Sequence, residues 1–419
     1  MTELKKQAVN LDNADSLKQF RDRFHIPVDS DGKLKVYFCG NSLGLQPKSS
    51  RMYIEQEMLD WENLGVEGHF EAKNPWKYYH HFLTESLEKL IGAKPKETVG
   101  MGTLTDNLNL LLISFYRPEG KRKKIIIEKK AFPSDMYSVK SHVRLHGGDD
   151  ADIIEIEPRK GENFFRTEDI IDTIDQVGEE LATVLLPGVN YFTGEVFDMK
   201  EITKAAHRQC AFVGFDLAHA IGNITMELHD WGADFAVWCS YKYLNAGPGS
   251  TAGIFVHERH SNQKNIPRLE GWWGTKEETR FMMRPYFEPM EGAGAWQQSN
   301  PAILPMASLK ASLDIFDEAG IDNLREKSKS MTGFLLKAIE AAHLDGVEVI
   351  TPKEDDRRGA QLSIRVNGAD KSLFNRLTEM GVVSDWREPD VIRIAPVPLY
   401  NSYMDCWEFA SRLKSAIEH

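Results

Sequence analysis

Four short apolar segments in the middle of the chain restrict its fold most strongly. They are rich in β-branched or aromatic residues and lie at Lys124–Glu128, Ala182–Leu186, Ala211–Asp216 and Phe235–Cys239. Each has the length and character of a strand that is buried on both faces. Helical patterns lie between or beside them, at Thr105–Tyr116 and Asp198–Gln209. This alternation predicts an α/β fold in which helices cover both faces of a parallel sheet.

The pattern changes near residue 300. Pro301 and Pro305 precede a helical pattern over Met306–Ala319, and two further strand patterns, Ala360–Val366 and Val391–Ile394, flank a helix near Ser372–Met380. We expect a large domain over residues 41–304 and a smaller α+β domain formed by residues 1–40 and 305–419.

Charge and composition exclude several classes of protein. The chain has 419 residues, 51 basic and 63 acidic side chains and a net charge of −12, which argues against nucleic acid or an anionic membrane as a partner. No apolar run approaches the ~18 residues of a membrane helix, and the N-terminus lacks an apolar signal segment. The cysteines, Cys39, Cys210, Cys239 and Cys406, are scattered without a C-x-x-C pair. We expect a cytoplasmic protein without disulfides, whose cysteines are mostly buried.

Polar residues follow two of the predicted strands at the edge where open α/β sheets bind ligands. Asp216 ends one strand, and Lys242 follows the next. An amine and a carboxylate so placed suit pyridoxal phosphate, because Lys242 can form a Schiff base with its aldehyde and Asp216 can pair with its pyridinium nitrogen. Taken alone, the same two residues could be ordinary surface ions.

A phosphate group needs a site of its own. Small residues at Gly102–Asn107 lead into a helix whose N-terminus can bind an anion, although Thr105 could simply cap that helix. Gly247–Thr251 offers backbone N–H groups, and Tyr241 offers a hydroxyl. Phe132–Asp135 follows another strand, and Phe132 could stack on a planar cofactor or pack in a turn.

Other motifs fail. Gly247, Gly249 and Gly253 do not have the spacing of a dinucleotide-binding loop, which argues against a nicotinamide enzyme. His80 and His81 lack H-E-x-x-H spacing, so we predict an exposed or capping pair and no metal site. The G-x-S-x-G motif of serine hydrolases is absent.

Seven segments together resemble the kynureninase family, whose members are fold type I pyridoxal phosphate enzymes. They are Tyr37–Pro47, Leu104–Thr105, Phe132–Asp135, Gly214–Ala220, Cys239–Asn245, Gly271–Gly274 and Arg393–Ser402. The resemblance covers nearly the whole chain and implies a large domain with a mostly parallel, seven-stranded type of sheet flanked by helices. Related desulfurases and aminotransferases share the Asp and the Lys but not this set.

The resemblance also implies roles for individual residues. Lys242 is the catalytic lysine, and Arg393 binds the α-carboxylate of the substrate. His69 and Ser42 line the aryl side, while Trp272 and Asn300 reach the site from the neighbouring subunit of a homodimer. The cofactor contacts implied are Leu104, Thr105, Phe132, Pro133, Ser134, Asp135, Asp216, His219, Tyr241, Lys242, Trp272 and Asn300. Pro187 stands where the family often has Ser or Thr, so a hydroxyl contact is lost.

The reaction implied is hydrolysis of L-kynurenine or 3-hydroxy-L-kynurenine to an anthranilate and L-alanine, in tryptophan degradation and NAD biosynthesis. His69 and Asn300, with Ser299, favour 3-hydroxykynurenine because they can bind its phenol hydroxyl. A desulfurase would need a reactive cysteine on a mobile loop, and a non-catalytic relative would have lost Lys242 or Asp216.

Overall fold

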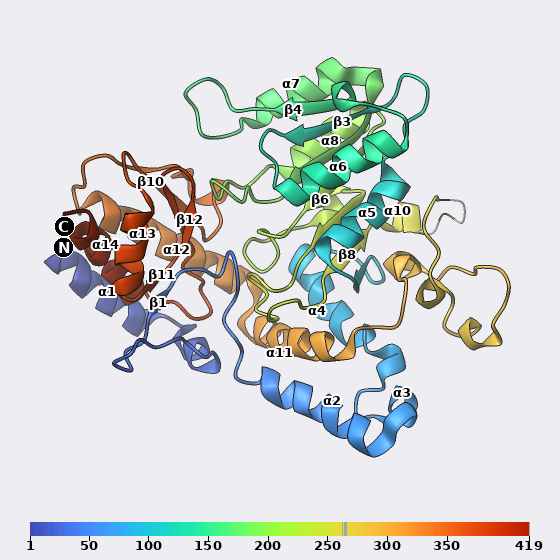
Figure 1. Cartoon of the computed structure of the whole chain (residues 1–419), viewed down its shortest axis with the longest axis horizontal. Helices are drawn as coiled ribbons and strands as arrows, with labels where there is room; N and C mark the ends of the chain where they lie inside the picture. The colour runs from blue at the N-terminus through green and yellow to red at the C-terminus, as the bar shows by residue number, and fades with distance from the viewer. Residues whose placement is uncertain (262, 264–265, 419) are drawn as a thin grey trace.

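The large body of the molecule is built around a seven-stranded sheet (Figure 1). The computed structural model describes residues 1–261, 263 and 266–418. The strands, in their order across the sheet, are β2 (Thr98–Gly100), β8 (Gly253–Val256), β7 (Phe235–Trp238), β6 (Phe212–Asp216), β5 (Leu181–Pro187), β3 (Lys124–Glu128) and β4 (Ile153–Ile156). Within this sheet, β8 runs antiparallel to both of its neighbours, and the remaining pairs are parallel.

Helices cover both faces of this sheet, as the apolar strands predict. In β3, Ile125 and Ile127 face one apolar cluster and Ile126 faces another, because successive side chains of a strand point to opposite faces. On the first face lie α5 (Leu104–Phe115) and α6 (Pro133–Leu145), and on the second lie α7 (Thr167–Val177) and α8 (Met199–Arg208). The predicted α/β class is confirmed.

Further helices lie in or against the large body. They are α2 (Ser50–Leu64), α3 (Gly68–Glu71), α4 (His81–Ile91), α9 (Leu228–Trp231), α10 (Glu258–Ser261) and α11 (Ile303–Ala319). The last of these begins three residues before the predicted Met306, with Pro305 in its first turn. Proline is tolerated there because the first N–H groups of a helix have no partner within it.

A smaller lobe carries an antiparallel sheet of its own (Figure 1). Its strands are β12 (Asp385–Arg387), β13 (Val391–Ile394), β10 (Leu362–Val366) and β9 (Val347–Val349), beside the short pair β1 (Val36–Tyr37) and β11 (Val382–Val383). The helices are α1 (Thr2–Ala14), α12 (Ile321–Glu340), α13 (Lys371–Glu379) and α14 (Tyr403–Glu418). Because α1 packs on α14, the two ends of the chain lie side by side.

The predicted strands and helices agree with the structure to within three residues at each end. No helix in the described part of the chain has both the length and the apolar character needed to cross a membrane.

Candidate active site

The carboxyl ends of several parallel strands meet at one edge of the large sheet. Glu128 ends β3, Pro187 ends β5 and Asp216 ends β6, and the register places Pro187 beside Asp216. Lys242 lies in the loop that follows β7. These residues line one cavity together with Leu104, Thr105, Phe132, Ser134, Asp135, Val189, Tyr191, Ala218, His219 and Tyr241. Asp216 and Lys242 thus meet where the strand pattern predicts.

Lys242 is held in a defined position at this cavity. Its Nζ atom lies 3.0 Å from Nε2 of His219 and 5.8 Å from the ring centre of Phe132. The Lys242 loop also packs against the N-terminal segment, because the N–H of Gly44 donates to the carbonyl of Tyr241 at 2.8 Å. A Cβ atom at Gly44 would overlap the carbonyl oxygen of Lys242, so only glycine permits this approach.

Three buried carboxyl groups lie at the same edge. Burial and the nearby Asp216 raise the pKa of Asp135 well above its ordinary value, and burial raises the pKa of Glu128 to about 8. Burial also raises the pKa of Asp216, but Asp135, the Lys242 ammonium and the Ala218 N–H, which donates at 2.7 Å, favour its ionised form. Of the three groups, Asp216 is therefore the one whose surroundings most favour the negative charge.

His219 is a buried, neutral imidazole. Burial lowers its pKa well below the ordinary value, and the positive charges of Lys242, Arg393 and Arg387 lower it further. Its Nε2 accepts from the ammonium of Lys242, which assigns the ring proton to Nδ1. Nδ1 of His219 and Oδ1 of Asp135 are buried without a hydrogen-bond partner among the described residues. Both atoms are therefore available to form hydrogen bonds with a bound group.

Two helices begin at this cavity and together form an anion site. The Oγ1 atom of Thr105, in the first turn of α5, lies 2.6 Å from Oγ of Ser134, in the first turn of α6. The N-cap of α5 is Thr103, whose hydroxyl accepts from the N–H of Asp106, so the alternative that Thr105 caps the helix is wrong. The two hydroxyls and the free N–H groups of both first turns can bind a phosphate.

The residues at this edge fit pyridoxal phosphate. The cavity offers an amine, an ionised buried carboxylate, an anion site and the ring of Phe132, which is 42% exposed and contacts Tyr191 edge to face. Gly247–Thr251 does not line this cavity. Gly249 and Thr251 line a neighbouring one of about 800 Å³ instead.

Arg393 reaches toward the same edge from β13. It is 1% exposed, forms an ion pair with Asp385 and donates to the carbonyl of Tyr191, whose ring lines the cavity. Burial lowers its pKa, although the charge of Asp385 opposes this. Its Nε has no hydrogen-bond partner among the described residues, so one donor of the guanidinium is free for a ligand.

Four predicted site residues lie away from the Lys242 cavity. Ser42 is in the turn after Cys39, and His69 is on α3 with its ring against Trp76. Trp272 and Asn300 are exposed and line other cavities. Among the described residues of one chain, none of these four lines the Lys242 cavity.

Three residues at the site do not follow from the motifs. Glu128 lies at the end of a predicted strand, so the strand-edge argument that identifies Asp216 could have found it. Tyr191, and Asp385 as the partner of Arg393, lie in segments with no sequence signal of their own.

Two expectations about other side chains need correction. Cys239 and Cys406 are buried and Cys39 is half-buried, as expected, but Cys210 is exposed because it lies in the turn between α8 and β6. His81 is exposed, whereas His80 is 2% exposed and its side chain caps nothing, since its ring turns inward before α4.

Comparison with known proteins agrees with this geometry. Residues 324–413 match the family model described as the kynureninase C-terminal domain. The chain is 54% identical over 406 residues to a kynureninase of Koribacter versatilis, covering 97% of this chain and 96% of the relative. It is 52% identical over 408 residues to a kynureninase of Myxococcus xanthus, with 97% and 96% covered.

Solved structures with the same fold have much lower sequence identity. A complex of the cystine C–S lyase C-DES with cysteine persulfide has a TM-score of 0.78 at 17% identity, covering 91% of this chain and 97% of that one. The cysteine desulfurase CsdA of Escherichia coli has a TM-score of 0.78 at 16% identity, covering 96% and 98%. These similarities establish the fold alone.

Proposed function

The chain belongs to the kynureninase family, and we propose that it performs that family's reaction at the edge of the sheet that carries Lys242. The enzyme is a pyridoxal phosphate-dependent hydrolase of C–C bonds. It cleaves the Cβ–Cγ bond of kynurenine to give an anthranilate and L-alanine, a step of tryptophan breakdown. The observation that carries this conclusion is 54% identity to a kynureninase over almost the full length of both chains.

Lys242 is the residue to which we assign the covalent and proton-transfer work. When bound, pyridoxal phosphate supplies an aldehyde that links to an amine and a ring that draws electrons from the α-carbon of the substrate. Because the Lys242 amine is held 3.0 Å from the neutral His219, it is placed both to hold the cofactor and to move the substrate's α-proton.

The remaining cavity residues orient the cofactor. We assign the phosphate to the first turns of α5 and α6, through Leu104, Thr105, Pro133 and Ser134, with Tyr241 beside them. Phe132 would stack on the cofactor ring, and Asp216 would pair with the ring nitrogen. We assign the remaining polar contacts with the cofactor to Asp135 and His219, through the side-chain atoms that have no hydrogen-bond partner among the described residues.

Arg393 is the residue that we assign to the substrate's α-carboxylate. Asp385 and the Tyr191 carbonyl fix its guanidinium, and its Nε is the donor that stays free. We propose that residues 41–304 form the cofactor domain, with α11 packed against it, and that the domain formed by residues 1–40 and 305–419 supplies the arginine.

We propose a homodimer, which would account for the predicted site residues that do not line the Lys242 cavity. The segment that starts at Trp272 exposes large apolar side chains: Trp272 is 44% exposed, Phe281 51%, Met282 61%, Met283 74% and Tyr286 59%. Such a surface is typical of an interface. We propose that a second copy covers it, and that Trp272 and Asn300 enter the neighbouring site, where Ser42 and His69 line the aryl side.

We propose a preference for 3-hydroxykynurenine, because His69 and Asn300 can hydrogen-bond its phenol hydroxyl. We also propose a cytoplasmic location, supported by four unpaired cysteines, and a contribution to NAD biosynthesis.

The test is to incubate the purified holoenzyme with each substrate and to measure the anthranilate by fluorescence and alanine by amino-acid analysis. Equal amounts of both products support hydrolysis, whereas a keto acid without alanine would indicate transamination. A kcat/KM ratio that favours unsubstituted kynurenine would contradict the proposed preference.

A further inference from the structure

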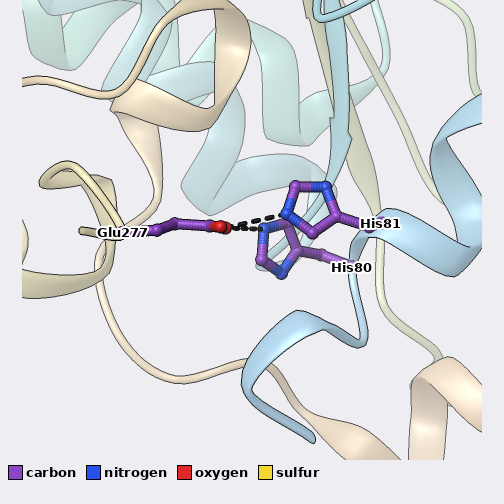
Figure 2. A group of neighbouring side chains, drawn as sticks. All are labelled: His80, His81 and Glu277. Carbon is purple, nitrogen blue, oxygen red and sulfur yellow. Dashed lines mark hydrogen bonds and ion pairs between the residues drawn. The ribbon is translucent and has the colours of Figure 1, made fainter. Parts of the chain in front are cut away.

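Three side chains with metal-ligating atoms lie together outside the cofactor cavity (Figure 2). His80 and His81 lie at the start of α4, and Glu277 lies in the loop after the 3-10 turn Trp272–Gly274. The Nε2 atoms of both histidines face Oε1 of Glu277, at 3.5 Å for His80 and 2.8 Å for His81. The three ligand atoms lie within 4.8 Å of one another.

An ion pair with Glu277 does not account for His80. The His80 side chain is 2% exposed, and neither ring nitrogen has a hydrogen-bond partner among the described residues. Leaving a buried polar group unpaired costs free energy, so such a group calls for an explanation.

The group borders a cavity of about 430 Å³, which gives room for water. Four charged side chains also line this cavity: Lys96, Lys276, Glu278 and Glu291. Lys96 is paired with Glu291 at 2.5 Å, so its charge is compensated. The two remaining charges, on Lys276 and Glu278, are of opposite sign.

We propose that His80, His81 and Glu277 bind one divalent transition-metal ion of the zinc class, with water as a further ligand. Two imidazoles and one carboxylate are a common zinc set, whereas Ca²⁺ and Mg²⁺ prefer oxygen ligands alone. In a tetrahedral zinc site with bonds near 2.0–2.1 Å, neighbouring ligand atoms lie about 3.3 Å apart. The observed separations of 2.8 and 3.5 Å lie on either side of that value, so small side-chain shifts would close the site.

A metal ion here would join two parts of the chain that are remote in sequence. Glu277 belongs to the loop that also carries Trp272, and the histidines begin α4. The ion would therefore fix the position of the loop that we assign to the dimer interface. None of the three ligands lines the Lys242 cavity, so the ion would lie outside the site of the assigned reaction.

A second group of similar composition, Glu97 with His229 and His257, provides a contrast. The carboxylate of Glu97 already accepts from the N–H groups of Lys94 and Glu258 and contacts Nδ1 of His229 at 2.9 Å. Its oxygens are occupied by these contacts, so we assign no metal to it.

The test is zinc binding by the full-length holoenzyme after treatment with a chelator and dialysis. Isothermal titration with Zn²⁺ alone should give one site per chain, and bound zinc should raise the thermal unfolding midpoint. Glu277→Gln and His81→Asn should each weaken binding at least about 100-fold and abolish the stabilisation. The matched control, Glu278→Gln, removes the same charge from the same cavity and should bind as the wild type does.

Two results would overturn the proposal. One is that the wild-type protein lacks a zinc site with a stoichiometry of one ion per chain. The other is equal zinc affinity in the wild type and in Glu277→Gln and His81→Asn proteins that retain the wild-type cofactor absorbance. Because these readouts do not use turnover, failure of the metal site leaves the assigned reaction untouched.

Discussion

The Nζ atom of Lys242 lies 3.0 Å from Nε2 of His219, at the edge of the sheet where Asp216 ends β6. The imidazole is buried and neutral, so its Nε2 accepts a hydrogen bond from the lysine without placing a second positive charge beside it. This contact fixes the amine between the ring of Phe132 and the buried carboxyl groups.

Asp216 and Asp135 should respond differently to the same substitution. Asp216→Asn removes the ionised partner of the cofactor ring, so kcat/KM should fall at least about 100-fold, or about 3 kcal/mol. Asp135→Asn replaces a carboxyl group whose pKa is raised well above its ordinary value. Because the amide that replaces it is uncharged, kcat/KM should fall much less than in Asp216→Asn. Steady-state kinetics of both variants with saturating cofactor checks this, and equal losses would contradict the charge assignment.

Arg393→Lys should raise KM for the substrate and lower kcat/KM about 10- to 100-fold. Lysine keeps the positive charge beside Asp385 but lacks the fork that can bind a carboxylate with two N–H groups. The matched control is Arg365→Lys on β10, whose partner Glu348 lies 2.9 Å away on the surface. If both variants show the same kinetics, Arg393 does not bind the substrate.

Glu128→Gln should change how the stability of the cofactor-free protein depends on pH. The pKa of Glu128 is about 8 in the folded protein, above its ordinary value of 4.5. Between these values the folded state retains a proton that the unfolded state loses, so Glu128 makes the wild type less stable as pH rises. The variant lacks this titration.

The free energy of unfolding of Glu128→Gln should therefore rise relative to that of the wild type between pH 5 and pH 8, by at most about 1.4 kcal/mol per pH unit. Urea unfolding at several pH values measures the difference. Glu155→Gln, an exposed carboxylate on the neighbouring β4, is the control. A constant difference for Glu128→Gln would refute the buried, protonated state.

Hybrid dimers test whether Trp272 acts in the neighbouring site. Lys242→Ala and Trp272→Ala homodimers should each be inactive or nearly so. Co-expression of the two chains should restore about one quarter of wild-type activity, because about half of random dimers are hybrids and each hybrid has one intact site of two. If Trp272 serves its own chain, mixing restores nothing.

Much of the fold could be predicted from the sequence because the buried strands are short apolar runs with clear ends. Lys124–Glu128 matches β3 at both ends, and Asp216 and Lys242 follow from the same reasoning. The sequence pattern starts α5 at Thr105, one residue late, because Thr103 and Thr105 are both plausible caps and only the N–H of Asp106 distinguishes them.

Contacts between distant segments could not be predicted in this way. Glu277 lies 196 residues from His81, and no spacing rule connects them, so the sequence alone predicts no metal site there. Asp385 pairs with Arg393 because β12 and β13 are neighbours, which only the sheet register reveals. Glu128 does not depend on such a distant contact, because it is the last residue of a predicted strand and its carboxyl group lies at the sheet edge that the same pattern predicts.

The most direct test of the central claim is reduction of the holoenzyme with sodium borohydride, followed by digestion and peptide mapping. Reduction makes the link between the cofactor and its lysine permanent. The predicted result is a cofactor label on the peptide that contains Lys242, and loss of that label in Lys242→Ala. A label on a different lysine, with Lys242 unmodified, would contradict the assignment of this cavity as the active site.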